Sequence, residues 1–353
     1  MTFELASLGW DAAYSAGLPA FDADVVPGRV ARVDRGVCTV LCADGPVRAS
    51  LAGAVLAAAS RDPARLPCAG DWVLVRVWPD DRVTIEAVLP RRTAIIRRTA
   101  DKDSSGQVLA ANLDVAAVVE PLDPMPDVGR IERLLALAWD SGARPLVLLT
   151  KCDAVPDPAA VADDLARSAP GVEVLTVSAR EGTGLDQVRP LVAAGRTLGL
   201  LGPSGAGKST LVNALAGAAV MGTRAVRESD GKGRHMTTYR ALIPIPGGGA
   251  VLDTPGMRQV GLLDGAEGLG QAFADVAEII AACRFADCTH QAEPNCAVRA
   301  ALESGELSPR RWESWERLSR ELAYETRRRE SRKAAVERAR LKQHRVRDTS
   351  RHI

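Results

Sequence analysis

Apolar and polar residues alternate in short runs along the first quarter of the chain. The runs are Arg29–Cys42, Asp71–Trp78 and Val83–Leu89. A period of two over roughly four to eight residues is typical of half-buried strands. Several such strands within about 65 residues predict a small β-barrel of the oligonucleotide-binding (OB) type. The alanine-rich segment Leu51–Ser60 predicts a helix between strands, and residues 1–24 predict a short helix or arm.

Five arginines of this barrel are candidates for facing nucleic acid: Arg29, Arg32, Arg35, Arg48 and Arg76. The alternative is that they are ordinary exposed charges, because any small barrel exposes alternate positions. The residues alone leave RNA binding by the barrel open.

The pattern then changes from short strands to strands alternating with helices. We interpret residues 91–113, which are Arg-rich and then polar, as a linker. Strand and helix in alternation indicate a parallel sheet. The predicted strands are Asp114–Val119, Pro145–Leu149, Val172–Val177 and Leu198–Leu201, and the predicted helices are Val128–Ser141, Ala159–Ser168 and Gly184–Ala194. Ala241–Ile245 and Ala250–Leu252 predict a hairpin pair turned by three glycines.

The C-terminal region predicts helices that end in a basic tail. Val298–Ser304 and Pro309–Arg340 follow a helical pattern, with Trp312, Trp315, Leu318 and Leu322 on one apolar stripe. Beyond Leu322 the stripe fades, and we expect the stretch that follows Lys333, up to Arg351, to be frayed or disordered when the chain is free. Residues 310–353 hold 15 Lys/Arg against 7 Asp/Glu, so the preceding 309 residues hold 30 against 37. A basic tail suggests a polyanionic partner, and the alternative is a solvated Arg-rich helix.

Composition places the chain among ordinary globular proteins. Of its 353 residues 46% are apolar and 25% charged, with a net charge of +1. There is no run of 18 apolar residues and no signal-peptide pattern at the N-terminus, so we expect a cytoplasmic protein without a membrane partner. The number of cysteines, seven, is odd, and disulfides are rare in cytoplasmic proteins, so we expect none here. Four of them, Cys38, Cys42, Cys68 and Cys152, are expected to be small core residues.

A glycine-rich loop lies between the predicted strand Leu198–Leu201 and a helical pattern. This strand, loop and helix order is the context that a P-loop requires. Its backbone N–H groups would surround phosphate oxygens, Lys208 would reach the β- and γ-phosphates, and the Ser209 hydroxyl would ligate Mg²⁺. We assign nine residues of this loop and helix start to the nucleotide: Gly202, Pro203, Ser204, Gly205, Ala206, Gly207, Lys208, Ser209 and Thr210.

A second motif is suited to recognising guanine. Thr150, Lys151, Cys152 and Asp153 end a predicted strand, and Ser178–Ala179 end the next one. The Asp153 carboxylate can accept hydrogen bonds from guanine N1 and N2, for which adenine has no matching donor pair. The Lys151 stem would cover one face of the base. A backbone N–H at Ser178 or Ala179 would reach guanine O6.

The remaining nucleotide elements follow the P-loop. Asp253, at the end of an apolar run, would hold Mg²⁺ through water, and the Gly256 N–H would sense the γ-phosphate. Either Thr237 or Thr238 would supply the switch hydroxyl to Mg²⁺; we prefer Thr238. The guanine motif therefore precedes the P-loop, which predicts a circularly permuted GTPase domain, a rearrangement that is feasible when the original termini lie close together.

Three cysteines and one histidine form a separate cluster. Cys283, Cys288, His290 and Cys296 lie within fourteen residues and match a closed tetrahedral zinc site. A closed shell leaves no position for a reacting water, so the predicted role is structural. The alternative is a set of buried cysteines beside an incidental histidine.

Over nearly its whole length the chain resembles the ribosome small-subunit-dependent GTPase A family of circularly permuted GTPases. The motif Gly233–Thr238 matches the family pattern with Met236 in place of a threonine, and Thr150 replaces the usual asparagine. The resemblance implies an arm and OB-fold over residues 1–92, a permuted GTPase domain over 93–262 and a zinc-binding helical domain over 263–353. It also implies GTP with Mg²⁺, one structural Zn²⁺, and the 30S subunit with its 16S rRNA as partners.

The catalytic residues are harder to assign. Met257 stands where many GTPases carry a glutamine that orients the attacking water, and a thioether cannot do so. His235 is the candidate for positioning water, and the alternative is a loop histidine without a catalytic duty. Arg258 is a weaker candidate, for charge stabilisation. We therefore predict His235, Lys208 and Gly256 as catalytic residues.

The nucleotide motifs predict a GTP hydrolase, and the resemblance implies that it acts in late 30S maturation, is stimulated by the subunit and is released on hydrolysis. One alternative is an RNA-binding assembly scaffold whose nucleotide site only gates affinity, which Met257 keeps open. Another is an ATP-dependent enzyme, which Asp153 disfavours. We further expect a monomer that binds no DNA.

Overall fold

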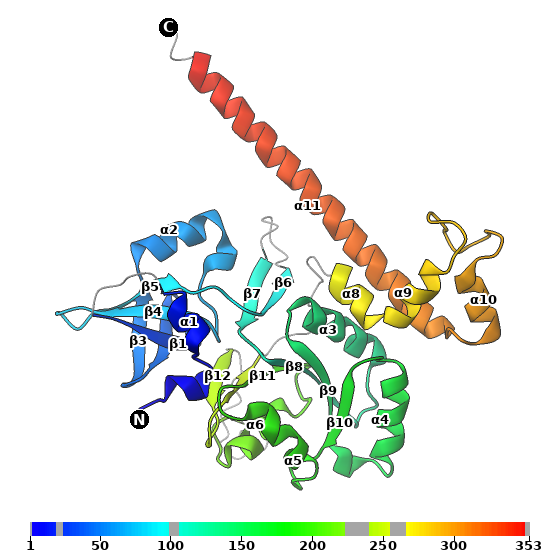
Figure 1. Ribbon diagram of the computed structural model, residues 1–353, viewed down its shortest axis with the longest axis horizontal. Coiled ribbons are helices and arrows are strands. Elements are labelled where there is room, and N and C mark those ends of the chain that lie inside the picture. The colour runs from blue at the N-terminus through cyan, green and yellow to red at the C-terminus, as the bar shows by residue number, and fades with distance from the viewer. Residues whose placement is uncertain (1, 19–23, 99–105, 223–239, 255–265, 350–353) are drawn as a thin grey trace, which may run out of the picture.

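The computed structural model describes residues 2–18, 24–98, 106–222, 240–254 and 266–349. Figure 1 shows a barrel near the N-terminus, a central sheet flanked by helices, and a group of C-terminal helices from which one long helix extends. Within these ranges no helix is long and apolar enough to span a bilayer. The architecture confirms the predicted multidomain fold class.

Five strands close the N-terminal barrel. They are β1 (Val25–Asp34), β2 (Val37–Cys42), β3 (Gly45–Leu51), β4 (Trp72–Val77) and β5 (Val83–Val88), in the order β1-β2-β3-β5-β4. All neighbours are antiparallel except β3 and β5. Inward positions such as Val30, Val40 and Ile85 are fully buried, which confirms the predicted alternation. The helix α2 (Gly53–Arg61) and the 3₁₀ turn η2 (Pro63–Arg65) connect β3 to β4.

The barrel arginines do not form the open basic face that the sequence allowed. Arg29 is 1% exposed and is buried against the N-terminal arm and the segment before β8, so the interpretation that it faces nucleic acid is wrong. Arg32 and Arg48 pair with Asp34, and Arg76 pairs with Asp24. The reason is that acidic residues of the same barrel lie opposite these side chains. Arg35 is exposed at the β1–β2 turn.

The central sheet has six strands in the order β10-β9-β8-β11-β13-β12. They are β8 (Val115–Pro121), β9 (Arg144–Thr150), β10 (Glu173–Val177), β11 (Thr197–Leu201), β12 (Ala241–Pro244) and β13 (Ala250–Asp253). All pair in parallel except the β12–β13 hairpin, as predicted. Strands buried on both faces read as continuous apolar runs, and β8, β9 and β11 do so.

Helices cover the sheet, and two of them start where an aspartate side chain supplies a cap. α3 (Val128–Asp140) begins after Asp127, whose carboxylate accepts from the Arg130 N–H at 3.0 Å. α4 (Pro158–Arg167) begins after Asp157 in the same way. Such caps contribute about 1 kcal/mol each. The helix predicted over 184–194 is wrong: α5 (Leu185–Val188) gives way to the 3₁₀ turn η4 (Arg189–Val192), since Pro190 cannot donate the next hydrogen bond.

The segment interpreted as a linker is largely a small sheet. β6 (Ala94–Arg98) and β7 (Gly106–Ala111) form an antiparallel pair. Ile95, Val108 and Leu109 are buried, so the apolar side chains between positions 91 and 113 pack in the core. The polar residues between the two strands hide this pattern in the sequence. This pair connects the barrel to the first strand of the sheet.

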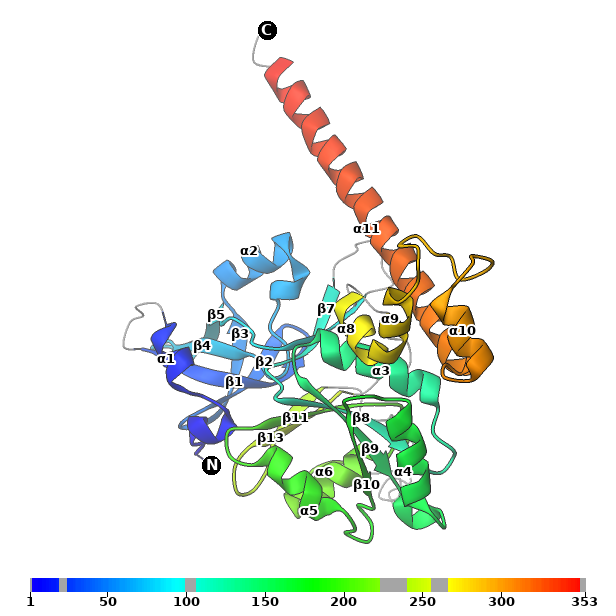
Figure 2. The ribbon, with the colours of Figure 1, turned by 45° about the vertical axis from the view of Figure 1, so that its right-hand side comes forward.

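The C-terminal part consists of α8 (Ala266–Ala272), α9 (Ala274–Ala281), α10 (Ala297–Ser304) and α11 (Pro309–Thr349). Figure 2 shows α8 and α9 lying against α3, and α11 leaving the body. Leu318 and Leu322 are buried, as their spacing predicted. Beyond Lys333, where we expect fraying, α11 instead continues as a helix through Thr349, because no glycine or proline follows Pro309.

Candidate nucleotide and metal sites

The glycine loop leaves the end of β11 and leads into α6 (Lys208–Ala216), which confirms the strand, loop and helix context. A side chain at position 202 would have its Cβ 2.2 Å from the Val119 carbonyl oxygen, so only glycine fits beside β8. Gly207, which caps α6, has φ +86°. The loop therefore has the backbone conformation of a phosphate cradle.

Lys208 is folded back over this loop. Its Nζ donates to the carbonyl oxygens of Gly202 and Pro203, both at 2.8 Å. Burial lowers the pKa of Lys208, whereas the carboxylates of Asp253 and Glu120 act to raise it. The Lys208 ammonium is therefore held among carbonyl groups of the loop, where it can bind the negatively charged oxygens of a phosphate.

Asp253 ends β13 directly beside the P-loop strand, in register with Leu200. It is 2% exposed, and its Oδ1 has no hydrogen-bond partner among the described residues. Burial raises the pKa of Asp253, and nearby Lys208 acts to lower it. An unpaired carboxylate oxygen in such a place fits a hydrated Mg²⁺, which would neutralise charge on the phosphates. The next residue, Thr254, donates to the Leu200 carbonyl at 2.7 Å and holds the strand end.

The guanine motif meets the P-loop directly. Thr150 is buried at the end of β9, and its hydroxyl donates to the Ala206 carbonyl of the loop at 2.6 Å. The two segments are 56 residues apart in the sequence, with the guanine motif first. Segments of the predicted motifs therefore converge on one edge of the sheet, where β8, β9, β11 and β13 all end.

Lys151 and Asp153 follow Thr150 in the guanine motif and have their own partners. Lys151 has φ +59°, and its Nζ donates to the Asp123 carbonyl at 2.9 Å. A hydrogen bond from Ser178 lowers the pKa of Asp153, so the carboxylate stays ionised for hydrogen-bond donors. The Ser178 N–H donates to Thr183, which leaves Ala179 as the candidate for guanine O6. Cys152 is buried, as expected for a small core residue.

Four predicted site residues, His235, Thr237, Thr238 and Gly256, lie outside the described residues, as do Met257 and Arg258. Their roles stay predictions. Ser209 is half-buried at the start of α6, and Ser204, Gly205 and Thr210 are exposed.

Sequence reasoning missed Glu120. This carboxylate is fully buried at the end of β8 and accepts from the Arg130 Nε at 3.1 Å and from the Asp127 N–H at 3.4 Å. Its backbone carbonyl lies 3.4 Å from the Thr150 hydroxyl. The signal was present in the sequence, because an acidic residue ends the apolar run 115–119 at the edge where the other site residues lie.

The Cys/His cluster forms a compact site in the C-terminal part. The ligand atoms of Cys283, Cys288, His290 and Cys296 all lie within 4.8 Å of one another. His290 Nδ1 is 3.6 Å from the sulfurs of Cys283 and Cys296. Bonds of about 2.0–2.3 Å in a tetrahedron give separations of roughly 3.3–3.8 Å, so the donor set fits Zn²⁺.

Neighbouring residues hold the cluster in shape. Trp312 of α11 packs edge-on against the His290 ring at 5.3 Å. The Glu293 carboxylate accepts from the backbone N–H of Thr289 at 2.8 Å and from its hydroxyl, and from the N–H of Gln291 at 3.1 Å. The hydrogen bonds from the hydroxyl and the backbone N–H of Thr289 lower the pKa of Glu293 to about 2. Glu293 thus fixes the backbone on both sides of His290.

Comparison with known proteins gives consistent matches. A family model described as RsgA GTPase matches residues 88–263. The chain is 51% identical over 321 residues to the small ribosomal subunit biogenesis GTPase RsgA of Streptomyces coelicolor, covering 90% of this chain and 86% of that protein. It is 43% identical to the protein of the same name from Opitutus terrae, covering 96% and 95%.

Two solved structures share the fold. YjeQ from Thermotoga maritima superposes with a TM-score of 0.61 at 24% identity, covering 85% of this chain and 99% of that one. YloQ, described as a circularly permuted GTPase, superposes with a TM-score of 0.57 at 22% identity, covering 86% and 98%. The order of the strands around the P-loop is therefore that of a permuted GTPase fold, as predicted.

Proposed function

The chain belongs to the RsgA GTPase family and is a GTP-hydrolysing enzyme, and we propose that it acts in maturation of the small ribosomal subunit. The observation that carries the proposal is the bond from Thr150 to Ala206, which joins the guanine motif to the P-loop. A single nucleotide then extends from Asp153 to Lys208. The scaffold alternative is not favoured, since the family is named for its GTPase activity.

The finer steps belong to this proposal as well. GTP and Mg²⁺ bind between the P-loop and Asp253, and Zn²⁺ is held by the Cys/His cluster. The enzyme acts late in maturation, contacts 16S rRNA as a cytoplasmic monomer, and leaves the particle after hydrolysis. The support from the residues is the net charge of the tail, 15 Lys/Arg against 7 Asp/Glu, because phosphate backbones attract such segments.

The test is multiple-turnover GTP hydrolysis by the full chain alone, with 30S particles and with 50S particles. We expect stimulation by 30S alone and none in Lys208→Ala. The 50S particle is the matched control, since it offers comparable RNA phosphate. Equal turnover in all three conditions would remove the ribosomal part of the proposal, and a preference for ATP in competition would remove the guanine assignment.

Binding and turnover are separable in the same assay. The chain bound to a non-hydrolysable GTP analogue should sediment with 30S particles, and the chain bound to GDP should not. Association that ignores the nucleotide would contradict release on hydrolysis and leave the GTPase assignment intact.

A further inference from the structure

The barrel strand β5 has one edge that is only partly paired. It pairs with β4 along its whole length, but with β3 only at Thr84 and Ile85. No described strand pairs with the same edge from Glu86 to Val88. Instead α2, the helix that follows β3, runs past this edge. Unpaired strand edges are templates for another extended chain unless something covers them.

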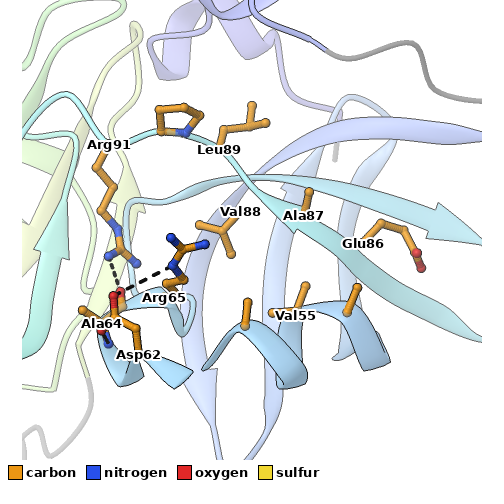
Figure 3. Close-up of a pocket in the computed structure, with 12 residues that line it drawn as sticks. Val55, Asp62, Ala64, Arg65, Glu86, Ala87, Val88, Leu89 and Arg91 are labelled. Atoms are coloured by element: carbon orange, nitrogen blue, oxygen red, sulfur yellow. Dashed lines mark hydrogen bonds and ion pairs between the residues drawn. The ribbon is translucent and has the colours of Figure 1, made fainter. Parts of the chain in front are cut away.

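The helix leaves a groove between itself and the edge rather than covering it. The groove has a volume of about 590 Å³ and is lined by α2, η2, β5 and the residues that follow β5. Figure 3 shows Val55 on one wall and Ala87, Val88 and Leu89 on the other. Much of the lining is methyl groups, including those of Ala54, Ala58, Ala64 and Ala87. Such small side chains let a peptide backbone approach the strand edge closely.

The two ends of the groove carry opposite charges. Arg65 lies at one end, its side chain 69% exposed and only loosely paired with Asp62 at 3.9 Å. Glu86 lies at the other end, where it accepts a hydrogen bond from Thr84. Figure 3 shows both positions.

Arg91 makes the basic end rigid. Its guanidinium donates to Asp71 at 2.7 and 2.8 Å and to the carbonyls of Ala64 and Leu66 at 2.5 and 2.8 Å. These bonds fix η2 against the segment that follows β5. The groove is therefore built into the barrel and held open by a buried ion pair.

We propose that this groove binds an extended segment of a partner protein by strand addition to β5. Backbone hydrogen bonds to the edge supply affinity, and aliphatic side chains at alternate positions fill the methyl-lined wall. A carboxylate of the segment lies at the Arg65 end and a cation at the Glu86 end. The wall from Glu86 to Arg91 is about six residues long at roughly 3.3 Å each, and within it Glu86 to Val88 offer the unpaired strand edge.

The lining selects peptide over RNA. Nucleic acid would require several unpaired cations, because affinity for RNA comes mostly from phosphate neutralisation. Here Arg91 is paired with Asp71, and Glu86 and Asp62 would repel phosphates. The groove is separate from the nucleotide site, so its failure as a binding site would leave the proposed GTPase function untouched.

The test measures binding of two fluorescein-labelled hexapeptides to the full chain by anisotropy. Their sequences are Asp-Val-Thr-Val-Thr-Lys and its reverse, each with fluorescein on the N-terminus and an amide at the C-terminus, so that the lysine stays charged and parallel and antiparallel addition are both sampled. We expect one of them to bind saturably below about 1 mM, since short strand additions are weak. Absence of saturable binding by both peptides would overturn the proposal.

Variants then locate the site. Ala58→Phe fills the groove and should weaken binding at least tenfold, whereas Ala57→Phe, on the exposed side of the same helix, should not. Equal binding by the two variants would place the peptide elsewhere and overturn the proposal. Two controls exclude a folding defect in Ala58→Phe. Its GTP turnover should equal that of the wild type, and the smaller substitution Ala58→Leu should also weaken peptide binding.

Two further comparisons test the mode of binding. Peptides N-methylated at both valines and both threonines lose the backbone donors of both strand edges but keep their side chains, and they should bind at least tenfold more weakly. Arg65→Glu should reverse the preference toward a peptide in which Asp and Lys are exchanged. Full retention of affinity by the N-methylated peptides would exclude strand addition.

Discussion

The central GTPase sheet contacts two neighbours, and the two interfaces differ in how charge is handled. On the barrel side the most deeply buried cation, Arg29, lies among neutral acceptors, and the ion pair between Asp11 and Arg92 is half-exposed. On the side of the C-terminal helices α8–α11 and the Cys/His cluster, called here the zinc module, the buried Arg311 pairs with the buried Glu132. The first interface is organised by backbone carbonyls and aromatic rings, and the second by ion pairs. The two should therefore respond differently to loss of a partner, to salt and to acid.

The barrel interface brings three segments to the Arg29 guanidinium. It donates to the carbonyls of Leu8 in the N-terminal arm, Gly70 in the barrel and Asn112 before β8. Its carbon lies 5.3 Å from the Trp72 ring centre, and Trp10 and Tyr14 pack on the same ring. Burial lowers the pKa of Arg29 to about 10. No carboxylate among the described residues lies within ion-pair distance of it.

The zinc-module interface centres on Glu132 of α3, which is 1% exposed. Arg310 and Arg311 of α11 reach its carboxylate at 3.0 and 2.8 Å. Arg311 also pairs with Asp275 at 2.7 Å. A half-exposed pair, Arg133 with Glu321 at 2.7 Å, lies farther along α11. These ion pairs have short distances, but the buried charges of Glu132 and Arg311 depend on each other, because an unpaired buried charge lowers the stability of the fold.

The largest expected effect is on the zinc-module side. Glu132→Ala leaves Arg310 and Arg311 without their shared acceptor and should lower the free energy of unfolding by about 3–5 kcal/mol. Urea denaturation followed by tryptophan fluorescence measures it. Glu321→Ala, at the same interface but half-exposed, should cost no more than about 1 kcal/mol. If both variants cost the same, burial is not what distinguishes the pairs.

The next effect is on the barrel side. Arg29→Met keeps the stem but removes the donors to three carbonyls, and should cost about 2–3 kcal/mol. Denaturation of the same chain is the measurement, and Arg32→Met, on a half-exposed barrel arginine, is the control. A loss as large as that of Glu132→Ala would mean that neutral acceptors stabilise as strongly as buried ion pairs.

Zinc should matter to one interface alone. Glu293→Gln keeps the shape of the side chain but weakens the bonds that hold the backbone around His290, and should lower Zn²⁺ affinity roughly 10–100-fold. Competition with a chromogenic chelator measures the dissociation constant for Zn²⁺. Glu303→Gln on α10 is a matched control away from the ligands. Hydrogen exchange after zinc removal should rise in α9–α11 and stay unchanged in the barrel; a barrel response would contradict the separation.

Acid provides the smallest test. Hydrogen bonds from Arg92 and from the Tyr14 N–H lower the pKa of Asp11, on the barrel side, from 3.8 to about 2. Because the folded value is the lower one, this stabilisation is present above about pH 4 and is lost as pH falls toward 2. The stability difference between wild type and Asp11→Asn should shrink over that range. A difference that stays constant would show that Arg92 does not act through the charge.

Much of the nucleotide site was predictable from residues that are close in the sequence. The P-loop, the guanine motif and the Cys/His cluster each occupy a short stretch, and the structure brings each together. Thr150 stands where the family that the chain resembles usually has an asparagine. The structure shows that its hydroxyl is bonded to the Ala206 carbonyl, so Thr150 braces the loop. That role depends on a neighbour 56 residues away, which spacing cannot indicate.

The errors have the same origin. Arg29 follows a pattern that also fits an exposed barrel position, and only its neighbours Leu8, Gly70 and Asn112 make it an interior residue. Residues 91–113 were interpreted as a linker because β6 and β7 are separated by polar residues. Their pairing is visible only once both strands are placed.

The sequence by itself determined the strand and helix alternation, the permuted order of the nucleotide motifs, and the metal-ligand set. These depend on residues a few positions apart, whose chemistry and period survive without knowledge of the fold. The tertiary structure decided which carboxylates are buried, that Glu120 lies behind the P-loop, and that the two interfaces use different charge pairings. Such features depend on contacts between segments as far apart as Glu132 and Arg311, 179 residues along the chain. Burial and desolvation of a charged group depend on the residues packed around it in the folded chain, and a local sequence pattern does not contain that information.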